Sequence, residues 1–262
     1  MPDALIGHTG FVGGNLAAQH RFHAWFNSKN VEAVRGQRFD TLVVSAMPAA
    51  MWVANADPDA DRATLDRLWD CLAACRAEAV VVVSTVAVYP VTVGVDEDTI
   101  VEPTYATPYG RHRRALECRA AAHFPRVLTV RLPALYGPGL KKNAVYDLLH
   151  DNDTHKIPAA AEYQYYNLNR LWRDVRTALA AGLECVNLTT APVSVRDVAR
   201  AAFGVAFDND PGTRPAAFDV RTKHAALFGG RDGYLESREQ VLAGLKAFVA
   251  AERRAVPLRG AA

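Results

Sequence analysis

The chain opens with a short apolar segment that breaks into a glycine-rich turn. Ala4–Ile6 is followed by Gly7-His8-Thr9-Gly10-Phe11-Val12-Gly13, and we expect a helix from about Val12 to His20. A strand that turns through glycines into a helix cradles nucleotide phosphates, because backbone N–H groups at a helix start point toward the anion. Gly7 permits the tight turn, Gly10 the approach of a pyrophosphate, and Gly13 close packing of helix on strand. A glycine turn without a ligand is the alternative.

Strands and helices are expected to alternate along the first two thirds of the chain. Further strands are predicted at Phe22–Phe26, Thr41–Ser45, Ala79–Val83, Val127–Leu132 and Glu184–Leu188, and helices at about Val31–Arg35, Asp61–Glu78 and Tyr109–His123. This alternation predicts an α/β fold with a Rossmann-type doubly wound parallel sheet. The run Ala79–Val83 is continuously apolar, so we expect it at the centre of the sheet.

The length bounds the domain organisation. With 262 residues, half of them hydrophobic, the chain can bury one α/β unit with a small appended lobe. We expect a dinucleotide-binding domain in residues 1–136. Residues 137–262 are expected to form mainly a substrate-binding lobe, interleaved with the last sheet strand near 184–188. Too few residues separate Asn27 from Ser45 for another strand with its helices, so the adenosine side is expected to be abbreviated.

Composition narrows the classes of partner. The chain has 30 basic and 28 acidic residues and no long block of like charge, which favours a small-molecule partner over nucleic acid. Its four cysteines lack metal-binding spacing and are interpreted as reduced, and no metal is expected. No apolar run approaches the ~20 residues that a spanning helix needs, and no leader pattern is seen at the start. A cytoplasmic protein without a membrane partner is therefore expected.

The end of the second predicted strand bears on the choice of cofactor. An NAD-binding unit usually places an acid there to hold the ribose 2′-hydroxyl, but this chain has Asn27, Ser28 and Lys29. A missing carboxylate beside a cation favours NADP slightly over NAD. Alternatively, Asn27 and Ser28 cap the next helix and leave Lys29 in solvent. Ser45 and Ala46, at the end of the strand Thr41–Ser45, are expected to contact the same cofactor.

A second group of polar residues follows the central strand. Ser84 and Thr85 come directly after Val83, where ligands of open α/β sheets bind. Tyr109 and Arg113 lie four residues apart on a predicted helix and therefore share a face. A fixed cation one turn away is expected to lower the pKa of a phenol and make it a better acid–base group. Taken alone, such a pair is more often an ordinary surface feature.

These motifs together resemble a known family. The glycine-rich turn, Val83–Tyr89, Pro108–Arg113 and Arg131–Gly139 are similar in order and spacing to the extended short-chain dehydrogenase/reductases, the NAD(P)-dependent epimerase/dehydratase superfamily. The resemblance continues through three later segments, Gln164–Arg170, Val193–Val198 and Asp219–Lys223. In its abbreviated stretch after the second strand, the chain is most similar to dTDP-4-dehydrorhamnose reductases and related sugar reductases.

The resemblance implies roles for the polar residues. Thr85 would bind the substrate oxygen, and Tyr109 would donate or accept its proton. Arg113 stands where the family has lysine, which holds the nicotinamide ribose and lowers the pKa of the tyrosine; arginine has a different shape. The family also implies a homodimer through the helices Asp61–Glu78 and Tyr109–His123. We expect their apolar residues to exceed what one sheet face requires: Leu65, Leu68, Trp69, Leu72, Ala115, Leu116 and Ala122.

Several other residues are candidates for substrate binding. Trp52 and Asn55 follow the strand Thr41–Ser45, where the fold passes the nicotinamide. Asn143 lies beside Lys141 and Lys142 on the expected substrate side, although adjacent lysines are more often a solvated loop. Tyr165 and Arg170 could stack a base and meet a phosphate, but a packed aromatic wall is the commoner use of such a cluster.

The sequence thus predicts an NAD(P)-dependent oxidoreductase or epimerase that acts on a nucleotide-linked sugar. Val86 follows Thr85 where dehydratases of the family have glutamate, so elimination is less favoured. Two alternatives stay open. One is a cofactor-binding sensor or scaffold with weak or no activity, and the other is a reductase of a carbonyl compound that carries no nucleotide.

Overall fold

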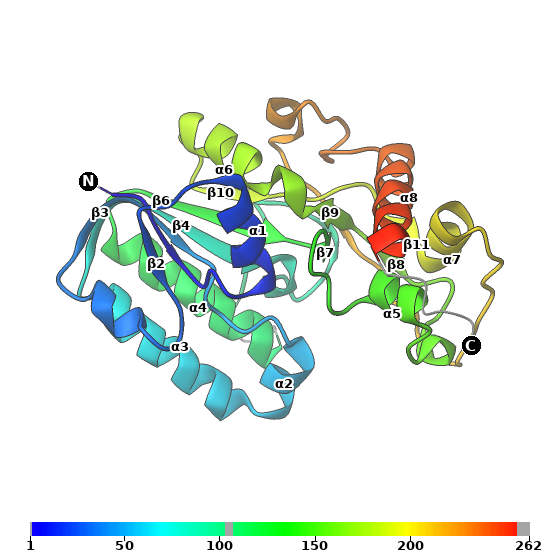
Figure 1. The fold of residues 1–262 in the computed structure, drawn as a ribbon, viewed down its shortest axis with the longest axis horizontal. Helices are drawn as coiled ribbons and strands as arrows, with labels where there is room; N and C mark the ends of the chain where they lie inside the picture. The colour runs from blue at the N-terminus through cyan, green and yellow to red at the C-terminus, as the bar shows by residue number, and fades with distance from the viewer. Residues whose placement is uncertain (1, 103–106, 256–262) are drawn as a thin grey trace.

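A six-stranded parallel sheet forms the centre of the molecule. The structure is a computed structural model that describes residues 2–102 and 107–255 (Figure 1). The strand order is β10-β6-β4-β3-β1-β2, and every neighbouring pair is parallel. The strands are β1 (Ala4–Ile6), β2 (Ala24–Phe26), β3 (Arg38–Val44), β4 (Arg76–Thr85), β6 (Val127–Leu132) and β10 (Cys185–Asn187). The predicted Rossmann-type fold is confirmed.

Strand β4 lies inside the sheet between β3 and β6, as its apolar sequence predicts. It is longer than expected, and the preceding helix is correspondingly shorter. The helix predicted over Asp61–Glu78 is α3 (Pro58–Leu72), and residues 76–79 already belong to β4. In this stretch Arg76 and Glu78 are exposed and Ala77 and Ala79 are buried, which is the two-residue period of a strand. The prediction of helix to Glu78 was therefore wrong.

Helices cover both faces of the sheet (Figure 1). Along β1, Ala4 and Ile6 point to one core and Leu5 to the other, as the alternation of a strand requires. The first core packs against α3 and α4 (Pro108–His123). The second packs against α1 (Phe11–Gln19) and α6 (Leu171–Ala180).

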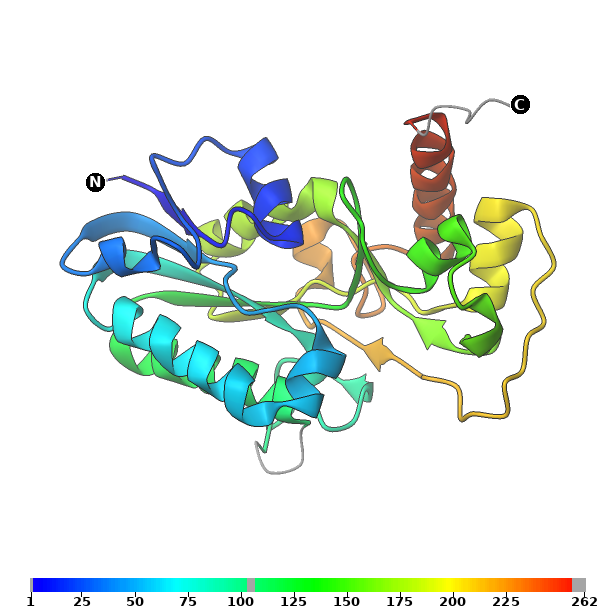
Figure 2. The same ribbon diagram turned by 60° about the horizontal axis from the view of Figure 1, so that its bottom comes forward.

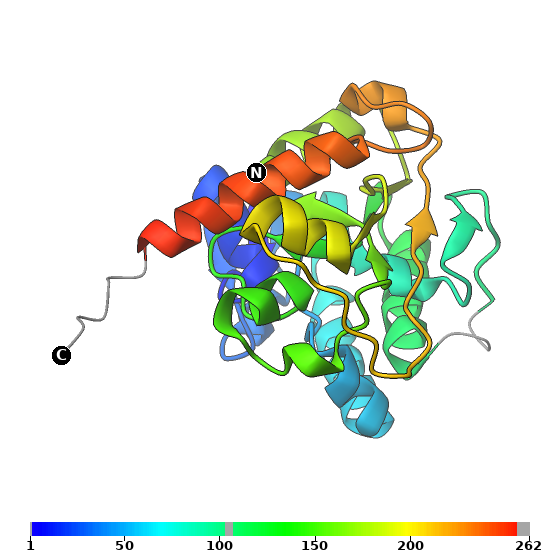
Figure 3. The ribbon, with the colours of Figure 1, turned by 90° about the vertical axis from the view of Figure 1, so that its right-hand side faces the viewer.

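The rest of the chain builds a smaller region beside the sheet (Figures 2 and 3). Its strands pair as β5 (Val93–Val95) with β12 (Asp219–Val220), β7 (Ala134–Tyr136) with β9 (Tyr165–Asn167), and β8 (Glu162–Tyr163) with β11 (Val193–Ser194). The α-helices here are α5 (Ala144–His150), α7 (Val195–Val198) and α8 (Arg238–Ala255). The sequence analysis did not predict α8, which buries Val241, Leu245 and Val249 on one face.

Short helical segments complete the chain. They are η1 (Val31–Val34), α2 (Met51–Ala56), η2 (Val86–Val88), η4 (Thr154–Lys156), η5 (Leu168–Arg170), η6 (Ala199–Phe203) and η7 (Ala225–Phe228). Between β2 and β3 the chain forms only η1, so β2 is the edge strand beside the glycine-rich turn. The sequence did not predict α2, which lies between β3 and α3.

The apolar residues of α3 and α4 do not form an outer surface. Leu65, Leu68, Leu72 and Leu116 are all buried in the core of the chain itself, with Trp69 and Ala115 packed against it. The outer face carries charges instead, because Asp66 pairs with both Arg62 and Arg119. Ala122 is the exposed member of the predicted set, so most of the expected apolar excess on these helices is used within the chain.

The hydropathy of the helices, the grouping of metal-ligand side chains and the state of the cysteines can each be followed within the described residues. There, no helix has the length and hydropathy to cross a membrane. The same residues hold no group of three or more His, Cys, Asp or Glu side chains that could bind a metal. All four cysteines are free, and Cys71 and Cys75 are buried in the core, as the sequence indicated.

Candidate active site

The glycine-rich turn between β1 and α1 is tight. Gly7 has a φ of +95°, and a Cβ atom at this position would lie 2.1 Å from the carbonyl oxygen of Ser45. Gly10 is the N-cap of α1, and no described side chain caps this helix. The first N–H groups of α1 are therefore free to bind an anion.

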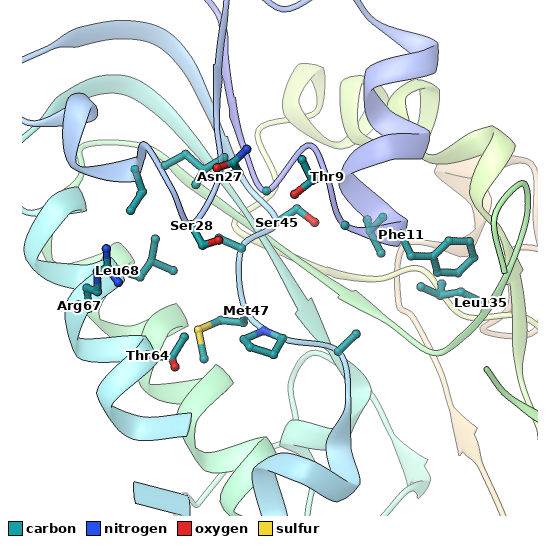
Figure 4. Close-up of a pocket in the computed structure, with 18 residues that line it drawn as sticks. Thr9, Phe11, Asn27, Ser28, Ser45, Met47, Thr64, Arg67, Leu68 and Leu135 are labelled. Atoms are coloured by element: carbon teal, nitrogen blue, oxygen red, sulfur yellow. The ribbon is translucent and has the colours of Figure 1, made fainter. Parts of the chain in front are cut away.

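A cavity of about 430 Å³ lies over this turn, at the carboxyl ends of β1, β2 and β3. Figure 4 shows Thr9 at the turn, Asn27 and Ser28 after β2, and Phe11 beside Leu135 at the opposite end. The predicted cofactor residues that line it are Gly7, Thr9, Gly10, Phe11, Val12, Asn27, Ser28, Ser45 and Ala46. Its volume lies within the range of small-molecule sites.

Gly13 and Lys29 lie outside this lining. Gly13 instead packs on the turn, where a Cβ atom would lie 2.0 Å from the carbonyl oxygen of Gly7. Lys29 is exposed, and its backbone N–H donates to the side-chain oxygen of Asn27 over 2.9 Å. The alternative, in which Asn27 closes a turn and Lys29 lies in solvent, therefore describes these contacts, and a role of Lys29 at the cofactor stays a prediction.

A different cation lines the cavity near Asn27 and Ser28. Arg67 and Thr64 on α3 line the side opposite Asn27 and Ser28 (Figure 4). The guanidinium of Arg67 makes a 3.2 Å ion pair with Glu32 of η1, and both side chains are largely exposed. Sequence reasoning missed Arg67, because an arginine on a helical surface carries no local pattern that marks it as a ligand.

Thr85 and Tyr109 meet beyond the carboxyl end of β4. Thr85 is the last residue of β4, Tyr109 lies in the first turn of α4, and the Thr85 side chain is near enough to the Tyr109 hydroxyl to lower its pKa. Asn55 at the end of α2 accepts a 3.0 Å hydrogen bond from the backbone N–H of Tyr109. Asn55 thus anchors the start of α4, and its side-chain oxygen is engaged by the protein rather than open to a ligand.

The pKa of Tyr109 moves in the opposite direction to the one predicted. Burial raises the pKa above the ordinary value of 10 because the phenolate is poorly solvated there. The charge of Arg113 and the hydrogen bond from Thr85 lower it, but Asp61 raises it. The net result is a phenol that holds its proton more firmly than free tyrosine.

Arg113 is buried, and both of its terminal guanidinium nitrogens are paired. Its Nη1 donates to Asp61 Oδ2 over 2.5 Å, and its Nη2 donates to the carbonyl oxygen of Pro48 over 2.5 Å. The guanidinium carbon lies 3.8 Å from the centroid of the Tyr109 ring. Pro48 also lines the cavity, so Arg113 adjoins its wall. Sequence reasoning missed Asp61, which lies on another helix 52 positions before Arg113.

The candidate substrate residues differ in whether their side chains are available to a ligand. Trp52 is 63% exposed on α2, and Lys142 Nζ lies 4.9 Å from its ring centroid. Asn143 caps α5 by accepting from two backbone N–H groups, and it donates to Leu135. Because all of its polar atoms serve the backbone, the prediction that Asn143 binds substrate is not supported by its contacts.

Tyr165 and Arg170 belong to the interior. Tyr165 is 1% exposed in the core of the smaller region, packed beside Tyr136 and Val249. Arg170 is paired with Glu236 and, at 3.3 Å, with Asp174. The prediction that Tyr165 and Arg170 bind substrate was wrong, and the alternative of a packed aromatic wall describes them better.

A buried polar network lies behind Thr85. Ser84 donates to Glu117 over 2.5 Å, and Arg131 binds both carboxylate oxygens of Glu117 at 3.1 and 2.7 Å. Arg131 also donates to the hydroxyl of Tyr89 over 2.7 Å. These contacts tie α4 to the ends of β4 and β6, and so they fix Thr85 relative to Tyr109.

The fold and the site together define a class of protein. A parallel sheet with a glycine-rich anion cradle at the switch between β1 and β3, and a Thr–Tyr pair beyond β4, is the framework of a dinucleotide-dependent enzyme. The sequence profile of the NAD dependent epimerase/dehydratase family matches residues 4–174, and the chain belongs to this family. The resemblance predicted from the motifs is thereby confirmed. No curated protein matches the sequence.

Solved structures share the fold over nearly the whole chain. The Pseudomonas aeruginosa RMD–NADPH complex has a TM-score of 0.73 at 16% identity and covers 98% of this chain and 100% of that one. A dTDP-4-dehydrorhamnose reductase of Clostridium acetobutylicum has a TM-score of 0.70 at 16% identity, covering 97% and 100%. MoeE5 with UDP-glucose and NAD has a TM-score of 0.69 at 19% identity, covering 97% and 99%.

Proposed function

We propose that this protein is an NAD(P)-dependent oxidoreductase or epimerase of a nucleotide-linked sugar, with Thr85, Tyr109 and Arg113 at its reaction centre. The observation that carries the proposal is the position of Tyr109. The Thr85 side chain is near enough to its hydroxyl to lower the pKa, and the guanidinium stacked on its ring is bonded to Pro48 in the wall of the cavity. A sensor has no need of a phenol placed at the reacting end of a cofactor.

The residues of the cavity fit a dinucleotide. Gly7 and Gly13 leave no room for side chains where the turn folds on itself, and the first N–H groups of α1 would bind the pyrophosphate. Arg113 Nε is buried without a partner among the described residues, which leaves one donor for an acceptor from outside the chain. When bound, the nicotinamide supplies or takes the hydride. Tyr109 exchanges the proton of the substrate oxygen, and Thr85 orients that oxygen.

We favour NADP(H) over NAD(H). No carboxylate follows β2 at Asn27 and Ser28, and Arg67 faces them across the cavity. A guanidinium suits a 2′-phosphate, because its planar donors match phosphate oxygens. Among similar folds, the Pseudomonas aeruginosa RMD binds NADPH and MoeE5 binds NAD.

A nucleotide sugar is the proposed substrate because several proteins of this fold handle one. MoeE5 binds UDP-glucose, and the Clostridium acetobutylicum protein is a dTDP-4-dehydrorhamnose reductase. Trp52 and Lys142 are the candidate contacts, since an exposed aromatic ring and a cation suit a base and a diphosphate.

A homodimer through α3 and α4, and a cytoplasmic location, remain predictions from the family resemblance. The outer face of these helices is charged, so a dimer there would rest on polar contacts such as those around Asp66 and Arg119. Sedimentation at micromolar concentration tests this, and a monomer would exclude the dimer.

A thermal-shift screen tests the proposed function. NADPH, NADH and a panel of nucleotide sugars are added singly to the parent protein and to Gly10→Val. We expect a nicotinamide dinucleotide to raise the Tm of the parent only, because a ligand stabilises by mass action and valine blocks the cradle. A parent that responds to no dinucleotide would refute the proposed function.

A further inference from the structure

Asp61 occupies an unusual position for an acid in the first turn of a helix. The cap of α3 is supplied by Asp57, whose side chain accepts from the N–H of Ala60 over 3.0 Å, so Asp61 is not needed there. Its side chain is only 4% exposed, and it faces α4 rather than solvent. A buried carboxylate is costly unless it is paired, so the contacts of Asp61 account for its presence.

Those contacts converge on one oxygen. Asp61 Oδ2 accepts from Arg113 Nη1 over 2.5 Å and lies 2.7 Å from Nδ1 of His112. The guanidinium of Arg113 makes two more hydrogen bonds. Nη2 donates to the carbonyl oxygen of Pro48, and Nη1 donates to the carbonyl oxygen of Tyr109 over 3.2 Å. The plane of Arg113 is therefore fixed by partners on three segments, with its face against the ring of Tyr109.

We propose that Asp61 is a positioning residue of this site: it locks Arg113 against Tyr109 and opposes the charge of the guanidinium, so that Tyr109 serves as the proton donor in the reduction of a carbonyl group. This inference rests on the proposed function and selects one reaction direction within it. Arg113 is then an ion-paired support for the phenol rather than the free cation that its sequence position implies.

The electrostatic argument follows from the pairing. A lone cation against Tyr109 would favour phenolate, whereas a carboxylate bonded to that cation opposes the effect. Burial raises the pKa of Tyr109, Asp61 raises it further, and Arg113 and Thr85 only partly offset this. The hydroxyl therefore remains protonated across the neutral range, which suits an acid and not a base.

The step balances as a reduction. A reduced nicotinamide gives a hydride to the carbonyl carbon, and the electron pair of the C=O π bond takes the proton of the Tyr109 hydroxyl. The substrate becomes an alcohol, Tyr109 becomes phenolate, and water restores its proton. Oxidation of an alcohol requires phenolate at the start, which the burial of Tyr109 and the charge of Asp61 oppose. The predicted substrate class is a nucleotide-linked keto sugar.

The test is a direct titration of Tyr109 in the full-length, cofactor-free protein. Tyrosine is labelled with ¹³C at Cζ, and the signal of Tyr109 is identified by its loss in Tyr109→Phe. We expect no titration below about pH 10 in the parent. In Asp61→Asn the midpoint falls by about one unit or more, because Arg113 is left unpaired. Asp61→Glu keeps the charge and restores the parent midpoint.

A matched control lies on the same helix. Asp66 is an exposed carboxylate of α3 that pairs with Arg62 and Arg119, and Asp66→Asn should leave the titration of Tyr109 unchanged. An Asp61→Asn midpoint equal to that of the parent would overturn the positioning role. If Asp61→Asn does not fold, the titration of Tyr109 in the parent protein is the test. A Tyr109 midpoint below 10 in the parent would contradict the proposed opposition of Asp61 to the charge of Arg113.

This result is separable from the proposed function. If no dinucleotide shifts the Tm but Tyr109 titrates as expected, the proposed function fails and reduction fails with it, while the positioning of Arg113 by Asp61 stands. If dinucleotides bind but Tyr109 titrates below 10, the proposed function survives and the inference of a proton donor is overturned.

Discussion

Gly13 and Gly7 are in such close contact that neither the helix nor the turn can move independently. A Cβ atom on Gly13 would lie 2.0 Å from the carbonyl oxygen of Gly7 and 2.6 Å from its carbonyl carbon. Both neighbours are backbone atoms, so they cannot yield as a side chain would. This contact fixes the position of the start of α1 relative to the turn after β1, and the first N–H groups of α1 lie beside the cavity.

Two neighbouring glycines of this segment, Gly13 and Gly14, should respond differently to alanine. Gly13→Ala should destabilise the protein by about 1–3 kcal/mol through overpacking, which outweighs the helix preference of alanine of about 1 kcal/mol. Gly14→Ala is the matched control: its Cβ would lie 3.6 Å from the nearest atom, so it should be neutral or stabilising. Urea unfolding of both variants and the parent measures the difference. Equal stability of the two variants would contradict the account of the turn.

The start of this fold could be predicted from sequence because its determinants are local. A buried strand, a glycine spacing and a helix follow one another within the first twenty residues, and the apolar run of β4 marks the centre of the sheet. The end of α3 was misjudged because Arg76-Ala-Glu-Ala contains good helix formers, and only pairing with β3 makes it a strand.

The candidate site was less predictable than the fold. Tyr109 and Thr85 come from motifs, but the partner of Arg113 lies on another helix, and no local spacing reports a contact across 52 residues. Likewise, Arg67 reaches the cavity only because α3 packs beside η1, whereas Lys29 is adjacent to the predicted site in sequence but is not among the residues that line the cavity. The division of the chain near residue 136 stays a prediction.

Cofactor choice is expected to depend on Arg67. Arg67→Ala should weaken NADPH binding about tenfold or more and leave NADH binding unchanged, because a charged hydrogen bond to the 2′-phosphate is worth about 1.5–3 kcal/mol. Lys29→Ala, which removes a nearby cation outside the cavity lining, serves as control and should change neither. Fluorescence titration gives both dissociation constants. A larger effect of Lys29→Ala would show that the 2′-phosphate lies elsewhere.

Removing one charge of the buried network should be severe. Glu117→Gln removes the negative charge that pairs with Arg131 and leaves the Arg131 charge buried. We expect the free energy of unfolding to fall by about 3–5 kcal/mol. The exposed pair of Asp66 offers the comparison, since Asp66→Asn should cost less than about 1 kcal/mol. Denaturant unfolding at neutral pH measures both. If the two substitutions cost the same, the network behind Thr85 does not stabilise the fold as its burial implies.

The proton chemistry should depend on a single oxygen atom. Tyr109→Phe removes only the hydroxyl, so turnover should fall by about 10²–10⁴-fold while the affinity for the dinucleotide stays the same. In the parent, the reductive rate should not be lost to Tyr109 ionisation as pH rises through the neutral range. Burial raises the pKa of Tyr109, so its proton remains available until the pH exceeds about 10. Steady-state rates with NADPH and a nucleotide-linked keto sugar, at fixed ionic strength, supply the profile. Full activity in Tyr109→Phe would show that Tyr109 takes no part in the chemistry. If the parent loses reductive rate near pH 8 and Tyr109→Phe does not, the phenol ionises too easily to be the proposed donor.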